Sequence, residues 1–154
     1  MIQFRKATLE DIDILVNLRV NFLKEVEKPS NEALSIVLRE SIHQFFRKKM
    51  HNNEFVSWIA TNEGKIIATS GVSFLDVPPS YANASGKEAY IMNLYTLPQF
   101  RKRGIGTKLL DKIISEVRKS MVKKIRLHST EIGKPIYIKK GFDDSNNEMV
   151  LYLE

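Results

Sequence analysis

The most informative stretch of the sequence is Ala89-Tyr90-Ile91-Met92-Asn93-Leu94-Tyr95-Thr96-Leu97-Pro98-Gln99-Phe100-Arg101-Lys102-Arg103-Gly104-Ile105-Gly106-Thr107. A mainly apolar run reaches Pro98, and a basic loop with two glycines follows it. Beyond the loop, large apolar residues recur with helical spacing at Leu109, Leu110, Ile113, Ile114, Val117 and Met121. The pattern predicts a strand over Ala89–Leu97, then the loop, then a helix over Arg103–Met121.

The loop combines two features that attract an anion. A helix start leaves about four backbone N–H groups without partners and carries roughly half a positive charge. Gly104 and Gly106 have no side chains to keep an anion from these groups, and Arg101, Lys102 and Arg103 add full charges. The stretch therefore favours a phosphate site. An ordinary glycine turn with solvated basic residues fits the same spacing.

Two common phosphate-binding motifs do not fit the loop. The P-loop spacing G-x-x-x-x-G-K-[ST] does not occur in the chain. The dinucleotide motif G-x-G-x-x-G would need a third glycine where Leu109 stands. It would also need the first strand of its unit, whereas this strand comes late in the chain.

The rest of the chain alternates between helical and strand-like patterns. The expected strands are Ile2–Lys6, Phe55–Thr61, Lys65–Leu75, Ala89–Leu97, Lys124–Ser129 and Glu148–Leu153. The expected helices cover Ile12–Val26, about 31–51, Arg103–Met121 and Lys134–Lys140. A break at Lys28-Pro29-Ser30 separates the first two helices, and Asp76–Lys87 is a loop. The order β-αα-β-β-β-α-β-α-β predicts a mixed α/β domain, of the α+β type with one mixed sheet.

Length and composition limit the class of protein. The chain has 154 residues, 43% hydrophobic and 27% charged, which is the balance of one globular domain over residues 1–154. No apolar run could span a membrane and the N-terminus turns charged at once, so we expect a cytoplasmic protein without membrane contact. Cysteine is absent and the three histidines are widely spaced, so no metal site is expected. The net charge of +6 favours an anionic partner.

Two motifs resemble those of the GCN5-related N-acetyltransferase (GNAT) family. Arg101-Lys102-Arg103-Gly104-Ile105-Gly106 resembles the family's [RQ]-x-x-G-x-[GA] motif, which binds the pyrophosphate of acetyl-CoA. Ile136-Tyr137-Ile138-Lys139-Lys140-Gly141-Phe142 resembles its L-Y-x-x-x-G-F segment. The two motifs lie about 30 residues apart. The expected order of elements also resembles the GNAT fold over the whole chain.

The resemblance implies a site for acetyl-CoA on the strand and the loop. Pantetheine would pair with the backbone of Leu94, Tyr95 and Thr96 along the strand. The pyrophosphate would contact the loop, whose residues are Arg101, Lys102, Arg103, Gly104, Ile105, Gly106 and Thr107. Thr130 stands where many relatives place an asparagine that contacts the cofactor, so this contact is weakened or absent.

The reaction implied by the resemblance is acetyl transfer from a thioester to a primary amine of a small molecule or a peptide. In the family, the two N-terminal helices help to set the acceptor. Glu25, Glu27 and Glu32 lie near the junction of these helices. They would attract a cationic amine, or they form an ordinary solvated turn.

Two proton transfers accompany this reaction. Tyr137 matches the family's general acid, which protonates the leaving thiolate, although packing of a short helix would also explain this residue. Many relatives carry a glutamate base where Met92 stands, and Met92 cannot accept a proton. Other relatives use a glutamate on the next strand, and the resemblance puts His128 there; Glu131 is a second candidate for the base. If the amine arrives neutral, no base is needed.

Other functions also fit parts of the sequence. Met92 at the base position is compatible with a catalytically silent acyl-CoA-binding or regulatory domain. The basic stretch 99–126 is compatible with nucleic-acid binding, but it lacks interleaved aromatic residues and a recognisable reader module. We therefore expect no nucleic-acid partner. A homodimer is compatible with the sequence, which leaves the oligomeric state open.

Overall fold

The computed structural model describes residues 1–28, 31–144 and 147–153. At its centre lies a sheet of five strands in the order β1-β2-β3-β4-β5. The strands are β1 (Ile2–Lys6), β2 (Phe55–Asn62), β3 (Lys65–Asp76), β4 (Lys87–Thr96) and β5 (Ile125–Leu127). Neighbouring strands run antiparallel, except that β4 and β5 are parallel. The prediction of one mixed sheet is therefore confirmed.

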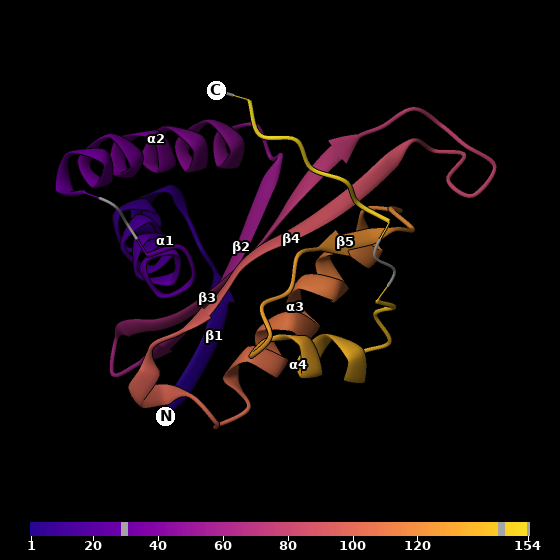
Figure 1. Cartoon of the computed structure of the whole chain (residues 1–154). Coiled ribbons are helices and arrows are strands. Elements are labelled where there is room, and N and C mark those ends of the chain that lie inside the picture. Colours follow the sequence, from indigo (N-terminus) through magenta and orange to yellow (C-terminus); the bar gives the residue numbers. More distant parts are fainter. Residues whose placement is uncertain (29–30, 145–146, 154) are drawn as a thin grey trace.

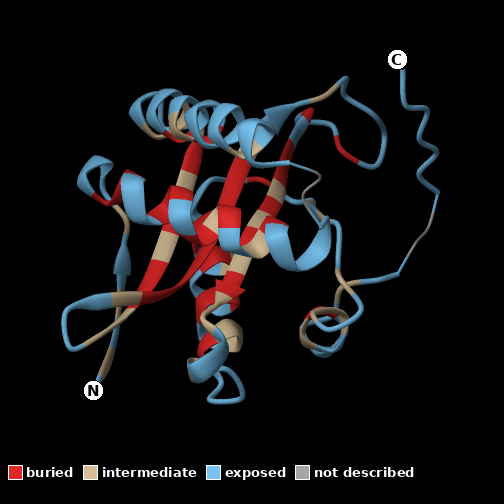
Figure 2. Ribbon diagram, turned by 60° about the vertical axis from the view of Figure 1, so that its left-hand side comes forward, coloured by how far each residue is buried: buried red, intermediate tan, exposed pale blue. Residues whose placement is uncertain are grey.

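Helices cover both faces of this sheet (Figure 1). They are α1 (Ile12–Val26), α2 (Glu32–His51), α3 (Ile105–Lys119) and α4 (Lys134–Lys139). On one face α1 and α2 pack around buried side chains such as Val16 and Phe46. On the other face α3 and α4 pack around buried side chains such as Leu110 and Tyr137. Figure 2 shows the buried residues gathered along the strands, between the two helical layers.

The connection from β4 to α3 follows from its local sequence. Pro98 begins a short 3-10 turn over Pro98–Phe100, which ends the strand. Gly104 has a φ of 73°, a left-handed conformation that glycine adopts without strain, and α3 begins at the next residue. The apolar side of α3 is then anchored by Leu109 and Ile113, which are fully buried against the sheet. The first turn of α3 is thereby held close to the end of β4.

A β-bulge changes the course of β4. Thr69 of β3 lies opposite Tyr95, but Gly71 lies opposite Met92, so β4 has one extra residue across this interval. Asn93, within the bulge, has a φ of 60°, which asparagine tolerates better than most residues. The pairing of β5 with β4 ends at Ile91. In the described part of the chain, the β5-facing edge of β4 is therefore unpaired beyond Ile91.

One expected strand does not form. The prediction of a strand over Glu148–Leu153 is wrong for the single chain, because residues 147–153 contain neither helix nor strand. Apolar sequence favours a strand only where a neighbouring edge supplies hydrogen-bond partners, and this segment pairs with no edge of its own sheet. β5 is also shorter than expected, since its pairing with β4 stops at Leu127. Of the expected break between α1 and α2, Pro29 and Ser30 lie outside the described residues.

Candidate functional site

The last residues of β4 use their side chains to hold the fold. Leu94 packs between the two apolar clusters under α3. Tyr95 is 6% exposed and meets Phe22 of α1 edge-on, with 6.2 Å between the ring centroids. Its hydroxyl donates a hydrogen bond to Glu25 Oε1 at 2.8 Å. The groups that this part of β4 can offer to a ligand are therefore those of its free backbone edge.

The loop after β4 presents backbone amides at the start of α3. The first helical hydrogen bond runs from the N–H of Lys108 to the carbonyl of Gly104 at 3.1 Å. The N–H groups of Ile105, Gly106 and Thr107 consequently precede the hydrogen-bond ladder of the helix. A Cβ built on Gly104 would meet no atom within 4 Å, so the space beside Gly104 itself is open. This geometry suits an anion at a helix N-terminus.

The three basic residues of the loop have different surroundings. Arg101 is tied to α1, since its Nη2 donates to both carboxylate oxygens of Glu25 at 2.9 Å. Its Nε donates to the carbonyl of Thr96, also at 2.9 Å. Arg103 lies over the ring of Phe100, at 5.3 Å from the centroid. Lys102 is exposed and has a φ of 62°, so it lies at the outer turn of the loop.

The contact between Arg101 and Glu25 joins the loop to α1. Desolvation acts to raise the pKa of Glu25, but hydrogen bonds from Tyr95 and Arg101 outweigh it and lower that pKa. Glu25 is therefore ionised at neutral pH, and its carboxylate is already bound. Of the three glutamates expected near a cationic acceptor, Glu25 instead fixes the position of the loop against α1.

Tyr137 lies on α4 and packs in the same apolar cluster as the buried side of α3. It is 8% exposed and meets Phe142 edge-on, with 5.7 Å between ring centroids. Burial, with a smaller effect of Tyr90, raises the pKa of Tyr137 to about 12. The phenol is consequently protonated throughout the neutral range and can donate a proton.

Thr130 acts at the start of α4. Its Oγ1 accepts a hydrogen bond from the N–H of Gly133 at 3.1 Å, and its carbonyl accepts one from Lys134 at 2.9 Å. A hydroxyl in this position satisfies amides that a helix start leaves free. Thr130 therefore supports the short helix that carries Tyr137.

A hydrogen-bonded chain of three side chains lies where β4 and β5 separate. The hydroxyl of Tyr90 on β4 contacts His128 Nδ1, and His128 Nε2 contacts Glu148 Oε2. Burial, followed by the charge of Glu148, raises the pKa of Tyr90. The neutral tautomer with hydrogen on Nε2 satisfies both contacts, because Tyr90 then donates to Nδ1 and Nε2 donates to Glu148. The three side chains are therefore hydrogen-bonded in series, from β4 to the C-terminal segment.

His128 and Glu131 are the base candidates from the sequence, and the structure places them in different surroundings. Both line a cavity of about 1030 Å³ between β5, α4 and the C-terminal segment, together with Tyr137. Glu131 is exposed at its rim, whereas His128 is joined to Tyr90 and Glu148. No pattern in the sequence indicates that Glu148 contacts His128, because the two residues are 20 positions apart and only the fold brings them together.

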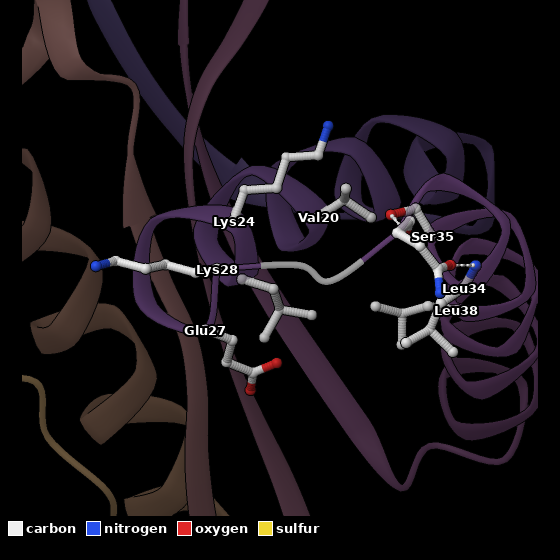
Figure 3. Close-up of a pocket in the computed structure, with 9 residues that line it drawn as sticks. Val20, Lys24, Glu27, Lys28, Leu34, Ser35 and Leu38 are labelled. Carbon is white, nitrogen blue, oxygen red and sulfur yellow. Dashed lines mark hydrogen bonds between the residues drawn. The ribbon is translucent and has the colours of Figure 1, made fainter.

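A second cavity lies on the other face of the sheet, where α1 ends and α2 begins. Its volume is about 340 Å³, and its apolar lining comes from Val20, Leu23, Leu34 and Leu38. Figure 3 shows Lys24, Lys28 and the carboxylate of Glu27 around it. The cavity combines an apolar wall with charges of both signs, which is the general character of a small-molecule site.

α1 also reaches the bulge of β4 directly. Arg19 Nη1 donates to Asn93 Oδ1 at 2.9 Å, and Asn93 is 6% exposed. Desolvation lowers the pKa of Arg19, although Glu27 and Tyr90 oppose this effect. The bulge, the Tyr90 chain and α1 therefore meet on one side of the opening between β4 and β5.

No helix in residues 1–28, 31–144 and 147–153 is both long and apolar enough to cross a membrane.

The chain is similar to solved acetyltransferases over nearly its whole length. A model of the acetyltransferase (GNAT) family matches residues 20–136. A predicted acetyltransferase from Clostridium acetobutylicum, solved with acetyl-CoA, is 36% identical, with 99% of this chain and 96% of that chain covered and a TM-score of 0.90. A GCN5-related N-acetyltransferase from Ralstonia eutropha is 23% identical, with 99% of each chain covered and a TM-score of 0.88.

More distant structures share the fold. Glucosamine-6-phosphate N-acetyltransferase from Arabidopsis thaliana is 19% identical, with 100% of this chain and 99% of that chain covered and a TM-score of 0.72. No curated protein sequence matches the chain significantly.

Proposed function

The chain belongs to the acetyltransferase (GNAT) family, and on that basis we propose that it transfers the acetyl group of acetyl-CoA to a primary amine of a small molecule or peptide. The observation that carries this proposal is the free first turn of α3 beside the unpaired edge of β4. The first turn of α3 offers N–H groups to an anion. The edge of β4 offers backbone groups to the extended arm of a ligand. The 36% identical relative, solved with acetyl-CoA, supports the same cosubstrate.

In this proposal the cosubstrate lies across the opening between β4 and β5. Pantetheine pairs with the backbone of Leu94, Tyr95 and Thr96. The pyrophosphate accepts hydrogen bonds from the free backbone amides at the start of α3, and Lys102 and Arg103 supply nearby positive charge. Arg101 acts as a positioning residue, because its guanidinium is held by Glu25 and by the carbonyl of Thr96. Thr130 supports α4 in place of a direct contact.

The acyl-transfer step needs a donor for the developing oxyanion and an acid for the leaving thiolate. A backbone N–H of β4, at Leu94 or a neighbour, is the proposed oxyanion donor. Tyr137 is the proposed acid, because burial keeps its phenol protonated. The amine nitrogen attacks the thioester carbon, the carbon–sulfur bond breaks, and the thiolate takes the phenolic proton. Solvent then restores the proton on Tyr137.

The amine must also lose a proton as the new bond forms. His128 is the proposed acceptor, acting through the hydroxyl of Tyr90, which takes the amine proton while passing its own to Nδ1. Glu148 holds the opposite nitrogen and stabilises the imidazolium that results. With this series of hydrogen-bonded side chains as the base, the reaction needs no glutamate at position 92. Met92 therefore does not by itself argue for a catalytically silent domain.

Acceptor classes known for relatives support an amine. The Arabidopsis structure is named for glucosamine-6-phosphate, and an aminoglycoside N-acetyltransferase solved with CoA also shares the fold, at 14% identity and a TM-score of 0.75. In this chain the cavity at the α1–α2 junction is the proposed place for the body of the acceptor. Its apolar wall suits an acceptor with an apolar part, and Lys24, Glu27 and Lys28 place charges of both signs beside that wall.

The test is turnover of acetyl-CoA with a panel of primary amines, followed by the release of free thiol. The panel should contain amino sugars, polyamines, aralkylamines and peptide N-termini. We expect thiol release that depends on one acceptor class and saturates with its concentration. Tight binding of coenzyme A without thiol release for any amine would contradict catalysis and favour the silent domain.

A further inference from the structure

Arg19 differs in its surroundings from the other arginines of the chain. It lies in the middle of α1, and in the part of the chain that the structure describes it is the only arginine that is not exposed. Its Nη1 donates to Asn93 Oδ1 at 2.9 Å, and its guanidinium lies 5.6 Å from the centroid of the Phe22 ring. Among the described residues, this is the hydrogen bond that its side chain forms, so further N–H groups of the guanidinium are available to a ligand.

The charge of Arg19 is also without an ion pair within residues 1–28, 31–144 and 147–153. Arg5, Arg101 and Arg126 each contact a carboxylate at 2.9 Å or less, whereas Arg19 has no such contact among these residues. A partly buried charge without a counter-ion costs free energy, and a carboxylate that binds it recovers part of this cost. A ligand that brings an anionic group to Arg19 is therefore stabilised there.

Arg19 lies next to the atoms that react in the proposed function. Its partner Asn93 lies in the bulge of β4, directly before Leu94, whose backbone N–H or that of a neighbour is the proposed oxyanion donor. The hydroxyl of Tyr90 begins the proposed proton path, and Tyr90 is close enough to Arg19 to influence its pKa. An anionic group bound to Arg19 therefore lies close to an amine that attacks the thioester.

The cavity at the α1–α2 junction begins one helical turn from Arg19. Leu23 follows Arg19 by four residues, so both side chains lie on one face of α1, and Leu23 lines the cavity. Val20, Leu34 and Leu38 also line it (Figure 3). Its volume of about 340 Å³ is near the lower end of the range of about 300–1,000 Å³ for small-molecule sites. The cavity therefore suits the apolar part of a small acceptor.

We propose that the acceptor is an α-amino acid with an apolar side chain, and that Arg19 binds its carboxylate. The apolar side chain fills the cavity, and the α-amine lies at the bulge of β4. The amine nitrogen bonds to the acetyl carbon as the carbon–sulfur bond breaks. The thiolate takes the proton of Tyr137, and the amine loses one proton through Tyr90 to His128. The products are an N-acetyl amino acid and coenzyme A. This inference names the acceptor class and rests on the proposed function.

A polyamine fits the charges around the cavity less well than an amino acid does. Glu27 is the carboxylate that lines the cavity in the described part of the chain, and Lys24 and Lys28 line it as well. With Arg19, the positive charges outnumber the negative one, and they repel a polycation. Lys24 and Lys28 are exposed, so each contributes little to binding a carboxylate. Arg19 is therefore the residue that selects the acceptor.

The first test compares each amino acid with its own amide, which has the same side chain and amine but no carboxylate. L-leucine, L-methionine and L-phenylalanine are assayed with acetyl-CoA beside the three corresponding amides. We expect kcat/KM for at least one amino acid to exceed that for its amide by about 10- to 100-fold, the range of a charge-assisted hydrogen bond. The amine of the amide is less basic and offers more of the neutral form, so this preference must come from the carboxylate.

Arg19→Gln removes the charge and keeps a side-chain donor. We expect this variant to bring the ratio of kcat/KM between amino acid and amide to about one, by raising KM for the amino acid, while Arg19→Lys keeps part of the preference. Arg39→Gln is the matched control, since Arg39 of α2 contacts the side chain of Asn17 on the exposed side of α1. It should leave the ratio unchanged. An equal loss of activity for amino acid and amide in Arg19→Gln would assign Arg19 to holding the bulge alone and would overturn the proposal.

Binding measured without turnover separates this inference from the proposed function. Each amino acid is titrated by calorimetry into the protein saturated with coenzyme A, which carries no acetyl group. We expect binding that Arg19→Gln weakens by at least about 10-fold. Turnover of amino sugars or polyamines but of no amino acid would overturn the proposal and leave acetyl transfer in place. Binding of an amino acid without turnover of any amine would contradict acetyl transfer and support the Arg19 site, and the absence of both would overturn both.

Discussion

At the scale of single residues, Tyr137 is the clearest case of a side chain altered by its surroundings. Burial against Phe142 and α3 raises its pKa to about 12, so the phenol is protonated at every pH at which the protein would be assayed. We predict that Tyr137→Phe slows turnover by roughly 10²-fold, within the usual range for a proton donor. Steady-state kinetics would measure the loss, and calorimetry should show little change in affinity for acetyl-CoA.

Tyr81→Phe is the control for this prediction, since the side chain of Tyr81 is fully exposed. It should leave turnover unchanged. Full activity of Tyr137→Phe would instead assign Tyr137 to packing alone. Because the pKa of Tyr137 lies near 12, any activity loss between pH 8 and 10 belongs to another group.

Gly104 allows a test of the anion site by charge alone. Its φ of 73° strains any substitute, so Gly104→Glu and Gly104→Gln carry the same backbone cost and a side chain of nearly the same shape. We predict that the glutamate variant binds coenzyme A at least about 10²-fold more weakly than the glutamine variant. A carboxylate beside the N–H groups of α3 repels the pyrophosphate. Equal affinities of the two variants in calorimetry would contradict the phosphate site.

The two base candidates can be distinguished by removing one at a time. We predict that His128→Gln lowers turnover by about 10²- to 10⁴-fold, because the Tyr90 hydroxyl then has no basic partner. Glu131→Gln is the control and should change turnover less than about twofold, since this carboxylate is exposed at the cavity rim. The comparison should be made across the pH profile. A larger effect of Glu131→Gln would reverse the assignment.

At the scale of elements, one carboxylate joins β4 to β5. Glu88 on β4 is buried and pairs with Lys124 and Arg126 at 2.8 and 2.6 Å. The hydrogen bond from Lys124 lowers the pKa of Glu88; desolvation opposes this effect, and Arg126 adds to it. A folded-state pKa below the unfolded one means that this stabilisation exists above about pH 4.5 and disappears as the pH falls through the folded value.

We predict that Glu88→Gln lowers the free energy of unfolding by about 1 kcal/mol at neutral pH, since its two partners are partly exposed. Urea denaturation at pH 7 and pH 3 would measure this difference. The gap between wild type and variant should be smaller at pH 3 than at pH 7, because the stabilisation by ionised Glu88 is lost as the pH falls. A gap that stays constant across this range would show that the pairs do not contribute.

The same scale shows where sequence reasoning succeeded. β4 and α3 were predictable because a strand stopped by Pro98 and an apolar helical face are local patterns of neighbouring residues. The bulge at Asn93 and the separation of β5 from β4 had no such pattern, since both depend on how two strands far apart in sequence align. The strand predicted over Glu148–Leu153 failed for a related reason. Its apolar composition is local, but the edge that would pair with it must come from elsewhere.

The same distinction, between local patterns and contacts across the fold, applies to the candidate site. The glycine loop before α3 and the short helix that carries Tyr137 were predictable from patterns within short segments. The bond of Arg101 to Glu25 was not, because 76 residues separate them and α1 must first pack on the sheet. The chain from Tyr90 to Glu148 likewise joins three segments. Its sequence signal was limited to His128 as an isolated candidate.

At the scale of the whole molecule, ligand binding should raise thermal stability. A ligand that binds only the folded state at 100 times its dissociation constant adds about 2.7 kcal/mol. For a domain of this size that corresponds to a rise in Tm of roughly 5–10 °C. We predict such a rise with acetyl-CoA, measured by calorimetry. Gly104→Glu should show no comparable rise, and an equal shift in that variant would place the cosubstrate elsewhere.

The sequence by itself determined the class of fold, the glycine loop before α3 and the short helix that carries Tyr137, because each depends on residues close together in the chain. The tertiary structure alone decided which charges are already bound, where β4 lies open and which base candidate is connected. These properties arise from contacts between segments that meet only after α1, β5 and the C-terminal segment have packed. A local pattern carries no information about the partner it will meet, and that partner sets the charge state, the exposure and the role of each group.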